Sequence, residues 1–536
     1  MYNNSSVTLA SLPIEIVTYI LSLLPQFALL PLRCANRQLS FIATTFAFRS
    51  VRLQAHGSSS AHFISIAKSE KLSPLVREVT CDTWIGPNFE YRAHGDYLIL
   101  PGFLTALPFL ASLRNVKALH LRFHRDCSRL DSYDEAEELP DIRFRILDTI
   151  FQSLAGTWSA QRQQEIDQSL QMCPTLYDYK ATTFPAPEIA SPIALTTLTV
   201  SNLADFDDPR VKTSDAFKKV LSSTSLTDLK LFITSETYGD DREWMTENPE
   251  KFDMFENLPG TWLSPVAANL TVLSLYFHEY WGWFPKMDFR LVGSLPHLKV
   301  LALGKYTFSH EWQVDWMASL GLEELYLDDC YILYQANCPM PMDHTTTVVG
   351  QDPKGDDIII SNEGFMRRDI WVSGDNIERI KFPLRWHTIF SRWQESMSTL
   401  KVFKFGYGSW EQAPKETRLA NYEGNPRKPS NTAVQNHPFE HNAFRYFDCP
   451  APGSKGDKYR KGTGLAKIKN LEFQYLYHET TDWTGWEEWV DIRREDADEG
   501  EWELDENLGA KDKAALDLLV SVAEERRITG AISRPL

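Results

Sequence analysis

The chain has 536 residues, of which 43% are hydrophobic and 24% are charged, and its formal net charge is −17. This length exceeds the ~250–300 residues at which one compact core stops growing, and the composition is too apolar for a disordered chain. The negative charge argues against a general nucleic-acid binder, because the field of the protein would repel a phosphate backbone.

The cysteines and the first apolar run indicate in which cellular compartment the protein is found. The seven cysteines are widely spread and form no Cys-x-x-Cys pair, which is typical of reduced thiols. The run from Ile14 to Leu32 is broken by prolines, whereas a membrane span needs ~20 nearly uninterrupted apolar residues. A signal peptide needs basic residues ahead of its apolar region, and none precedes this run. We expect a cytoplasmic or nuclear protein that is not secreted and has no membrane partner.

The first predicted elements are short helices within residues 10–50. In "LPIEIVTYILSLLP", Pro13 suits a helix start and Glu15 favours the positive end of the helix dipole. The following apolar residues recur at helical spacing as one stripe: Ile16, Val17, Ile20, Leu21 and Leu24. Two more apolar segments follow, "FALLPLRCANRQLSFIA" and "TTFAFRSVRL". Three helices this short cannot bury all these side chains among themselves, so the surplus covers either the following domain or a partner.

The segment "LPIEIVTYILSLLPQFALLPLRCANRQLSFIA" resembles an F-box, the module that binds the Skp adaptor of Skp–cullin–F-box ubiquitin ligases. Ala28 and Leu39 depart from the F-box pattern, which carries an acidic residue and an aromatic residue at these positions. An amphipathic cap on a larger domain is the alternative interpretation. The resemblance implies that these residues bind the adaptor: Leu12, Pro13, Glu15, Ile16, Ile20, Leu21, Leu24, Leu29, Leu32, Arg33 and Arg37.

Residues 51–534 contain a recurrent Leu-x-x-Leu-x-Leu-like block. Its last two apolar positions alternate as in a strand with one buried face, and strands this short need stacked neighbours. The intervals from Leu273 to Leu301 and from Leu301 to Leu325 fit the ~20–29 residues of a leucine-rich repeat, and longer intervals imply insertions. The blocks are "VREVTC", "LRNVKALHL", "LTTLTV", "LTDLKL", "LTVLSL", "LKVLAL", "LEELYL", "LKVFKF" and "IKNLEF".

The segments between the blocks complete the predicted architecture. "DAFKKVLSST" and "LRWHTIFSRWQESMS" are expected to form helices of an outer layer, and "DKAALDLLVSVAEERR" a C-terminal capping helix. Long loops are expected near 335–375 and 409–462, and the acidic tract near Glu501 as a solvated linker. The predicted fold class is α/β, with a short three-helix F-box followed by an irregular leucine-rich-repeat solenoid. The whole resembles large fungal F-box proteins with leucine-rich repeats.

The sequence contains no convincing catalytic motif. "HPFEH" places His437, Glu440 and His441 in the order of an inverted zinc-protease motif, but Pro438 and polar flanks disfavour the helix that such a site needs. "GTGLAK" from Gly462 lacks the third glycine of a dinucleotide site, and there is no Walker A sequence. We expect a non-enzymatic protein without cofactor or metal.

We therefore expect the repeat region to bind a partner protein. Residues that flank the inward leucines face the concave side of such a repeat, and the aromatic run "YWGWFP" follows one block. The alternative for that run is that its rings fill gaps between imperfect repeats. The candidate target-binding residues are Phe232, Tyr276, Trp281, Trp283, Tyr326, Asp328 and Lys404.

Together these features predict the substrate-recognition subunit of a Skp–cullin–F-box ubiquitin ligase. The resemblance implies the Skp adaptor and the cullin scaffold as partners, and an unidentified protein as the target. The chain itself would contribute only proximity and orientation to the reaction. A protein-interaction scaffold outside any ligase is the alternative.

Overall fold

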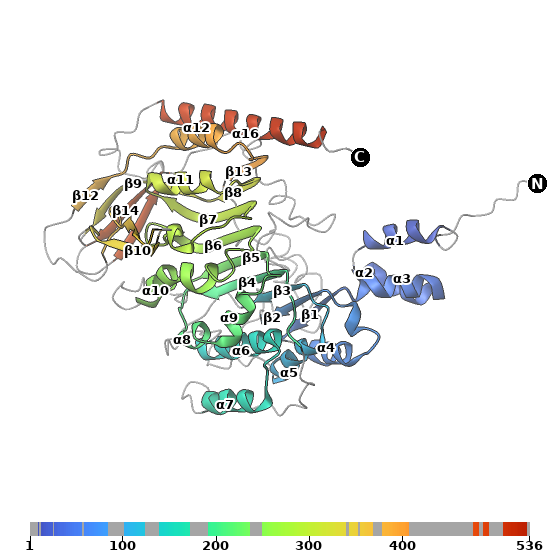
Figure 1. Ribbon diagram of the computed structural model, residues 1–536. Coiled ribbons are helices and arrows are strands. Elements are labelled where there is room, and N and C mark those ends of the chain that lie inside the picture. The colour runs from blue at the N-terminus through green and yellow to red at the C-terminus, as the bar shows by residue number, and fades with distance from the viewer. Residues whose placement is uncertain are drawn as a thin grey trace, which may run out of the picture.

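Figure 1 shows the computed structural model of the chain. The structure describes residues 9, 12–24, 26–55, 58–83, 101–123, 139–171, 191–235, 249–338, 342–351, 354–367, 378–406, 475–481, 486–491 and 507–532.

A large, mostly parallel sheet runs through the described part of the chain. Its first strands lie side by side in sequence order, and each is parallel to the one before it. These strands are β1 (Ser50–Gln54), β2 (Glu78–Asp82), β3 (Ala118–Arg122), β4 (Thr197–Ala204), β5 (Asp228–Thr234), β6 (Val272–Trp281), β7 (Val300–Phe308) and β8 (Glu324–Asp328). Strand β13 (Val402–Gly406) then pairs with β8, also in parallel.

The apolar blocks found in the sequence are these strands, in one common register. The first inward residue of each block pairs with the first inward residue of the next, and all are buried. The strand prediction is therefore confirmed for "VREVTC" and for every later block except "IKNLEF", whose Leu471 lies outside the described residues. The paired residues are Val79, Leu119, Leu198, Leu229, Leu273, Leu301, Leu325 and Phe403.

The residue just before each strand repeats one backbone arrangement. Its amide N–H donates to the carbonyl oxygen of the corresponding residue of the previous strand, at N···O distances of 2.7 to 3.0 Å. The chain thus enters every one of these strands in the same way, which places the residues in one line along an edge of the sheet. We call this line the strand-start row: Arg49, Arg77, Lys117, Thr196, Thr227, Thr271, Lys299, Glu323 and Lys401.

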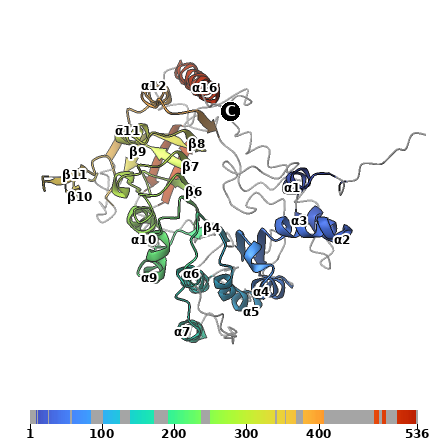
Figure 2. The ribbon, with the colours of Figure 1, turned by 45° about the vertical axis from the view of Figure 1, so that its right-hand side comes forward.

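Helices cover one face of the sheet and form the outer layer, on the outside of an arc of strands (Figure 2). Rings from neighbouring outer segments interlock: Phe217 lies between Phe151 and Trp262, at centroid distances of 4.9 and 4.8 Å. The segments are α4 (Ser59–Lys68), η2 (Ser73–Leu75), α5 (Pro101–Ala106), η3 (Leu107–Ser112), α6 (Pro140–Ala155), α8 (Pro209–Lys212), α9 (Asp215–Leu221), α10 (Pro249–Leu258), η5 (Pro259–Leu263), η6 (Phe289–Val292), α11 (Glu311–Ser319), α12 (Trp386–Ser396) and α16 (Leu508–Ile532). The helices expected at "DAFKKVLSST", "LRWHTIFSRWQESMS" and the C-terminal segment are confirmed as α9, α12 and α16.

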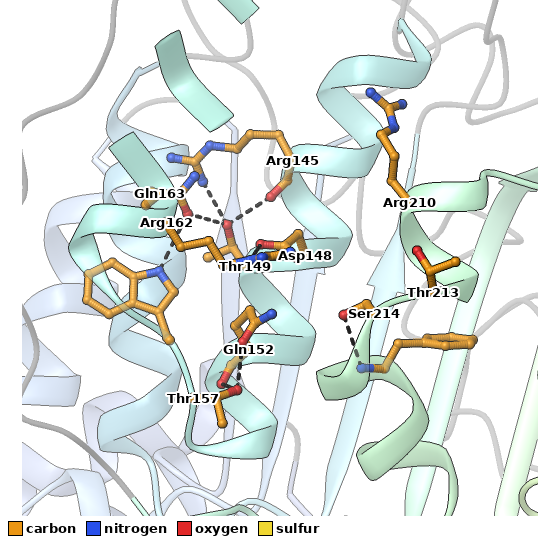
Figure 3. A network of polar contacts seen from close by, with 12 residues as sticks. Arg145, Asp148, Thr149, Gln152, Thr157, Arg162, Gln163, Arg210, Thr213 and Ser214 are labelled. Atoms are coloured by element: carbon orange, nitrogen blue, oxygen red, sulfur yellow. Dashed lines mark hydrogen bonds and ion pairs between the residues drawn. The ribbon is translucent and has the colours of Figure 1, made fainter. Parts of the chain in front are cut away.

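The long interval between β3 and β4 contains a helical hairpin formed by α6 and α7 (Ala160–Gln171). Buried polar groups join the two helices (Figure 3). Arg145 Nε donates to Asp167 Oδ1 at 3.0 Å, and Thr149 Oγ1 donates to Gln163 Oε1 at 2.6 Å. Because α7 has few apolar residues, this polar network takes the place of an apolar seam.

The sheet branches at β7. Its first residues pair with β8, whereas Thr307 and Phe308 pair with β9 (Tyr331–Cys338). Strands β12 (Glu378–Lys381) and β14 (Tyr475–Thr481) flank β9, and β15 (Trp486–Asp491) follows β14. Lys305, with φ +55°, lies at the branch point, where the chain leaves the common register.

The expectation of a long loop over residues 335–375 is only partly met. Within it the structure has an antiparallel hairpin, β10 (Thr346–Gln351) and β11 (Asp357–Ser361), in addition to the end of β9. The hairpin strands are rich in Thr, Val and Ile, which favour strands, but the surrounding Pro, Gly and Asp residues obscured them. The expected loop over 409–462 lies outside the described residues.

The N-terminal helices α1 (Ile14–Ser22), α2 (Gln26–Ala35) and α3 (Arg37–Ala47) stand beside the sheet rather than on its outer face (Figure 1). They have an apolar core of their own: Val17, Leu21, Leu29, Leu39, Ile42, Ala43 and Ala47. We refer to these helices as the three-helix unit. The side chain of Asn36 caps α3 by accepting the N–H of Leu39 at 2.8 Å.

Candidate protein-binding surfaces

The three-helix unit exposes large apolar side chains. Twelve large apolar side chains are exposed among the described residues of the whole chain, and half of them belong to this unit. Each of the six is between 45% and 77% exposed: Ile14, Ile16, Tyr19, Leu23, Leu30 and Phe41. Because water disfavours apolar surface of this extent, the unit presents the strongest candidate docking surface of the described chain.

The predicted adaptor-binding residues divide into surface and core. Pro13, Glu15, Ile16 and Arg37 are exposed. Five others are half-buried: Leu12, Ile20, Leu24, Leu32 and Arg33. Leu21 and Leu29, in contrast, are buried in the core of the unit, so their side chains support the surface from below.

The sequence analysis predicted one apolar stripe along α1, whereas in the structure the apolar residues of this helix lie on two faces, one buried and one exposed. Val17 and Leu21 face the core of the unit, whereas Ile16, Tyr19 and Leu23 are exposed. The latter three recur at i, i+3 and i+7, so helical spacing alone could have separated them from the core pair. Leu30 and Phe41 were also missed, because no sequence rule said which face of α2 and α3 their own unit would cover.

Arg33 has a structural role within the unit. Its Nε donates to Thr44 Oγ1 at 3.0 Å, and the centre of its guanidinium lies 4.6 Å from the ring centroid of Phe48. The side chain thus joins α2 to the end of α3.

Four of the predicted target-binding residues lie together on the inner face of the sheet, which is the face opposite to the helices. Tyr276 OH donates to Asp328 Oδ2 at 2.9 Å, and its ring centroid is 5.4 Å from that of Phe232. Tyr326 OH donates to Glu324 Oε2 at 2.6 Å, and burial together with Glu324 raises the pKa of this phenol. All four are at most 9% exposed, whereas Lys404 on β13 is half-buried. Lys404 is therefore the most accessible residue of the predicted inner-face set.

Trp281 and Trp283 are interior residues, as the gap-filling alternative for "YWGWFP" predicted. Trp281 Nε1 donates to the carbonyl of Gly304 at 2.7 Å within the main core. Trp283 Nε1 donates to the carbonyl of Gly364 at 2.7 Å in a second core, which also contains Phe365. Neither indole is placed to contact a partner from the surface.

A charged cluster on β1, β2 and β3 was not anticipated from the sequence. Arg52 and Arg122 both donate to the carboxylate of Asp82, which is fully buried; Arg122 Nε lies 2.9 Å from Asp82 Oδ1. Burial alone would raise the pKa of Asp82, but the two guanidinium groups hold it below its ordinary value. Asp82 and Arg122 directly follow the blocks "VREVTC" and "LRNVKALHL" and pair in register. Opposite charges at this equivalent position of neighbouring blocks are the signal in the sequence that could have identified the pair.

The described residues contain no candidate metal site and no candidate membrane span. Within the described ranges no group of three metal-ligating side chains comes together, and no helix there has the length and apolarity of a membrane span. His437, Glu440, His441 and Gly462 lie outside the described residues.

No protein-family model matches the chain, and no curated protein matches its sequence.

Proposed function

We propose that this protein is a substrate-recognition subunit of a Skp–cullin–F-box ubiquitin ligase. In this proposal the three-helix unit is the F-box and binds the Skp adaptor, and the sheet with its outer helices is an irregular leucine-rich-repeat solenoid that binds a protein target. The observation that carries the proposal is the exposed apolar surface of a unit that already has its own core.

The arrangement of the unit favours docking over capping. A cap would turn its apolar side chains toward the repeats, whereas Ile16, Tyr19 and Leu23 remain open although Val17 and Leu21 fill the internal core. Burying a side chain of this size stabilises a complex by about 1.5–3 kcal/mol before the costs of association. A surface of this kind is therefore suited to a stable partner.

The strand register supports the repeat assignment. Apolar blocks separated by helices of unequal length still pair residue to residue from β2 to β8 and β13. Each such repeat cannot bury its apolar face alone, so stacking produces one continuous core. The chain would act without chemistry of its own, in the cytoplasm or nucleus, by holding the target near the ubiquitin-charged enzyme.

Adaptor binding tests the proposal directly. The full chain is titrated with purified Skp adaptor by isothermal calorimetry, alongside an Ile16→Asp/Leu23→Asp variant and a Leu518→Asp control. Leu518 is a similarly exposed residue on α16, far along the chain from the unit. Wild type and control are expected to bind, and the double variant to lose at least about a hundredfold in affinity.

The opposite result is equally informative. If the folded wild type does not bind the adaptor, the ligase function is excluded, and the remaining function is an interaction scaffold outside any ligase. Circular dichroism of all three proteins separates loss of binding from loss of fold.

A further inference from the structure

The strand-start row carries its charges unevenly. Its first three members, Arg49, Arg77 and Lys117, are cations on three successive strands, β1 to β3. Because neighbouring strands lie ~4.8 Å apart, the row places positive charge at close intervals along one edge of the sheet. Arg114 adds a fourth cation in the turn that leads into β3.

Contacts between turns hold this group together. Arg77 Nη1 donates to the carbonyl of Pro74 at 2.7 Å, and Asn115 Nδ2 donates to the same oxygen at 2.8 Å. The turn that carries Arg114 is therefore fixed beside Arg77. Lys117 Nζ lies 3.4 Å from the carbonyl of Ala194, so its stem also follows the edge.

These cations form no ion pair with a carboxylate in the described part of the chain. Among the described residues, none of the four has a carboxylate oxygen within the 4.0 Å of an ion pair. Arg49, Arg114 and Lys117 are exposed, and Arg77 is half-buried. Backbone carbonyls orient Arg77 and Lys117 but do not neutralise them.

The far end of the same row is different. Lys299 Nζ and Lys401 Nζ lie 2.8 and 2.7 Å from the two oxygens of Glu323, which separates them in the row. Hydrogen bonds from these lysines lower the pKa of Glu323 to about 2. Within the row, Glu323 before β8 thus neutralises the cations before β7 and β13, whereas the cations before β1, β2 and β3 have no such partner in the row.

We propose that Arg49, Arg77, Arg114 and Lys117 form a binding surface for an acidic polypeptide segment. Unpaired cations at close spacing repel one another, and a run of Asp or Glu side chains would relieve this repulsion. The patch is opposite in sign to the chain as a whole, whose formal net charge is −17. The patch begins at Arg49, directly after α3, and so borders the three-helix unit. This surface is separate from the apolar one and does not require the adaptor.

The test uses the full chain without adaptor and a fluorescein-labelled peptide of alternating glutamate and serine, followed by fluorescence anisotropy. The neutral control peptide alternates glutamine and serine. An Arg77→Gln/Lys117→Gln variant is compared with a Lys299→Gln/Lys401→Gln variant, which removes the same number of charges from the other end of the row. Arg114→Gln is the conservative variant, because this side chain is exposed, and circular dichroism checks that every variant remains folded.

The glutamate peptide is expected to bind wild type and the Lys299/Lys401 variant equally, and the Arg77/Lys117 variant about tenfold more weakly. Arg114→Gln is expected to weaken binding by about threefold, and added salt to weaken binding to wild type. Equal affinity for the glutamate and glutamine peptides overturns the proposal, as does an equal loss in the Lys299/Lys401 variant. Tighter binding of single-stranded oligothymidylate through the same residues overturns the acidic polypeptide as the partner.

Discussion

The hydroxyl of Tyr276 donates a hydrogen bond to the carboxylate of Asp328, 2.9 Å away, although the two residues belong to strands separated by β7. The ring of Tyr276 crosses β7 at Gly304, where a Cβ would overlap the ring atoms. Gly304 therefore allows an aromatic side chain to lie flat on the sheet and to link β6 with β8.

A double-mutant cycle tests this arrangement. Gly304→Ala should destabilise the protein by about 2–4 kcal/mol, because the new methyl group and the buried ring cannot occupy the same space. In a Tyr276→Ala background the same substitution should cost less than about 1 kcal/mol, since the ring is gone. Urea unfolding of the four proteins gives the coupling energy, and additive effects would contradict the overlap.

The division of the three-helix unit into core and surface predicts opposite outcomes for neighbouring residues. Leu21→Ala should lower the free energy of unfolding of the unit by about 2–5 kcal/mol, because Leu21 is fully buried. Ile16→Ala should change it by no more than about 0.5 kcal/mol, because this side chain is exposed. Hydrogen exchange of the amides in α1 to α3 measures both. A large effect of Ile16→Ala on stability would show that the repeats cover it.

His310 should make stability sensitive to pH. Burial lowers its pKa to about 4, from an ordinary value near 6.5. The ring stacks on Phe365 at 4.4 Å and its Nε2 lies 3.0 Å from the carbonyl oxygen of Glu363. The folded state keeps the ring neutral, so the unfolded chain binds a proton first as the pH falls. The contribution of His310 to the free energy of unfolding is therefore complete above about pH 6.5 and is lost as the pH drops toward 4.

The size of this effect follows from the difference between the two pKa values, which allows a loss of up to about 3 kcal/mol. In a His310→Gln variant the loss of stability between about pH 6.5 and 4 should become smaller by the contribution of His310; a part remains, because burial also lowers the pKa of His478 to about 3. The free energy of unfolding is measured for both proteins by urea titration across this range. Parallel curves for wild type and variant would contradict the prediction.

Asp512 of α16 caps the first turn of α12 from outside the helix. Its Oδ1 accepts the backbone N–H of His387 at 2.9 Å, and its Oδ2 accepts the hydroxyl of Tyr475 at 2.7 Å. Asp512→Asn should cost about 1–3 kcal/mol, because a buried charge-assisted cap is lost while the shape is kept. Asp517→Asn, in the same helix and paired with Lys513 at the surface, should cost less than about 0.5 kcal/mol. Thermal unfolding of the two variants compares them.

The sequence alone determined the strands β2 to β8 and β13 and their repetition, but not β1, which lies at the end of the expected third helical segment, nor the strands around β9. Residues such as Leu198, Leu229 and Leu325 alternate with polar neighbours over a few positions, and this local pattern is sufficient to predict a strand with one buried face. The apolar excess of the first fifty residues was likewise visible, as were the helices α9, α12 and α16.

Only the tertiary structure decided which apolar and polar residues are accessible. Trp281 and Tyr276 are buried because segments distant in the sequence close over them, whereas Ile16 and Phe41 stay exposed because the core of their unit is filled by other residues. The strand-start row has the same origin: Arg49, Arg77 and Lys117 are far apart in the chain, and only parallel pairing brings them to one edge. Local patterns set secondary structure because backbone periodicity is local, but exposure and charge proximity depend on contacts between distant segments.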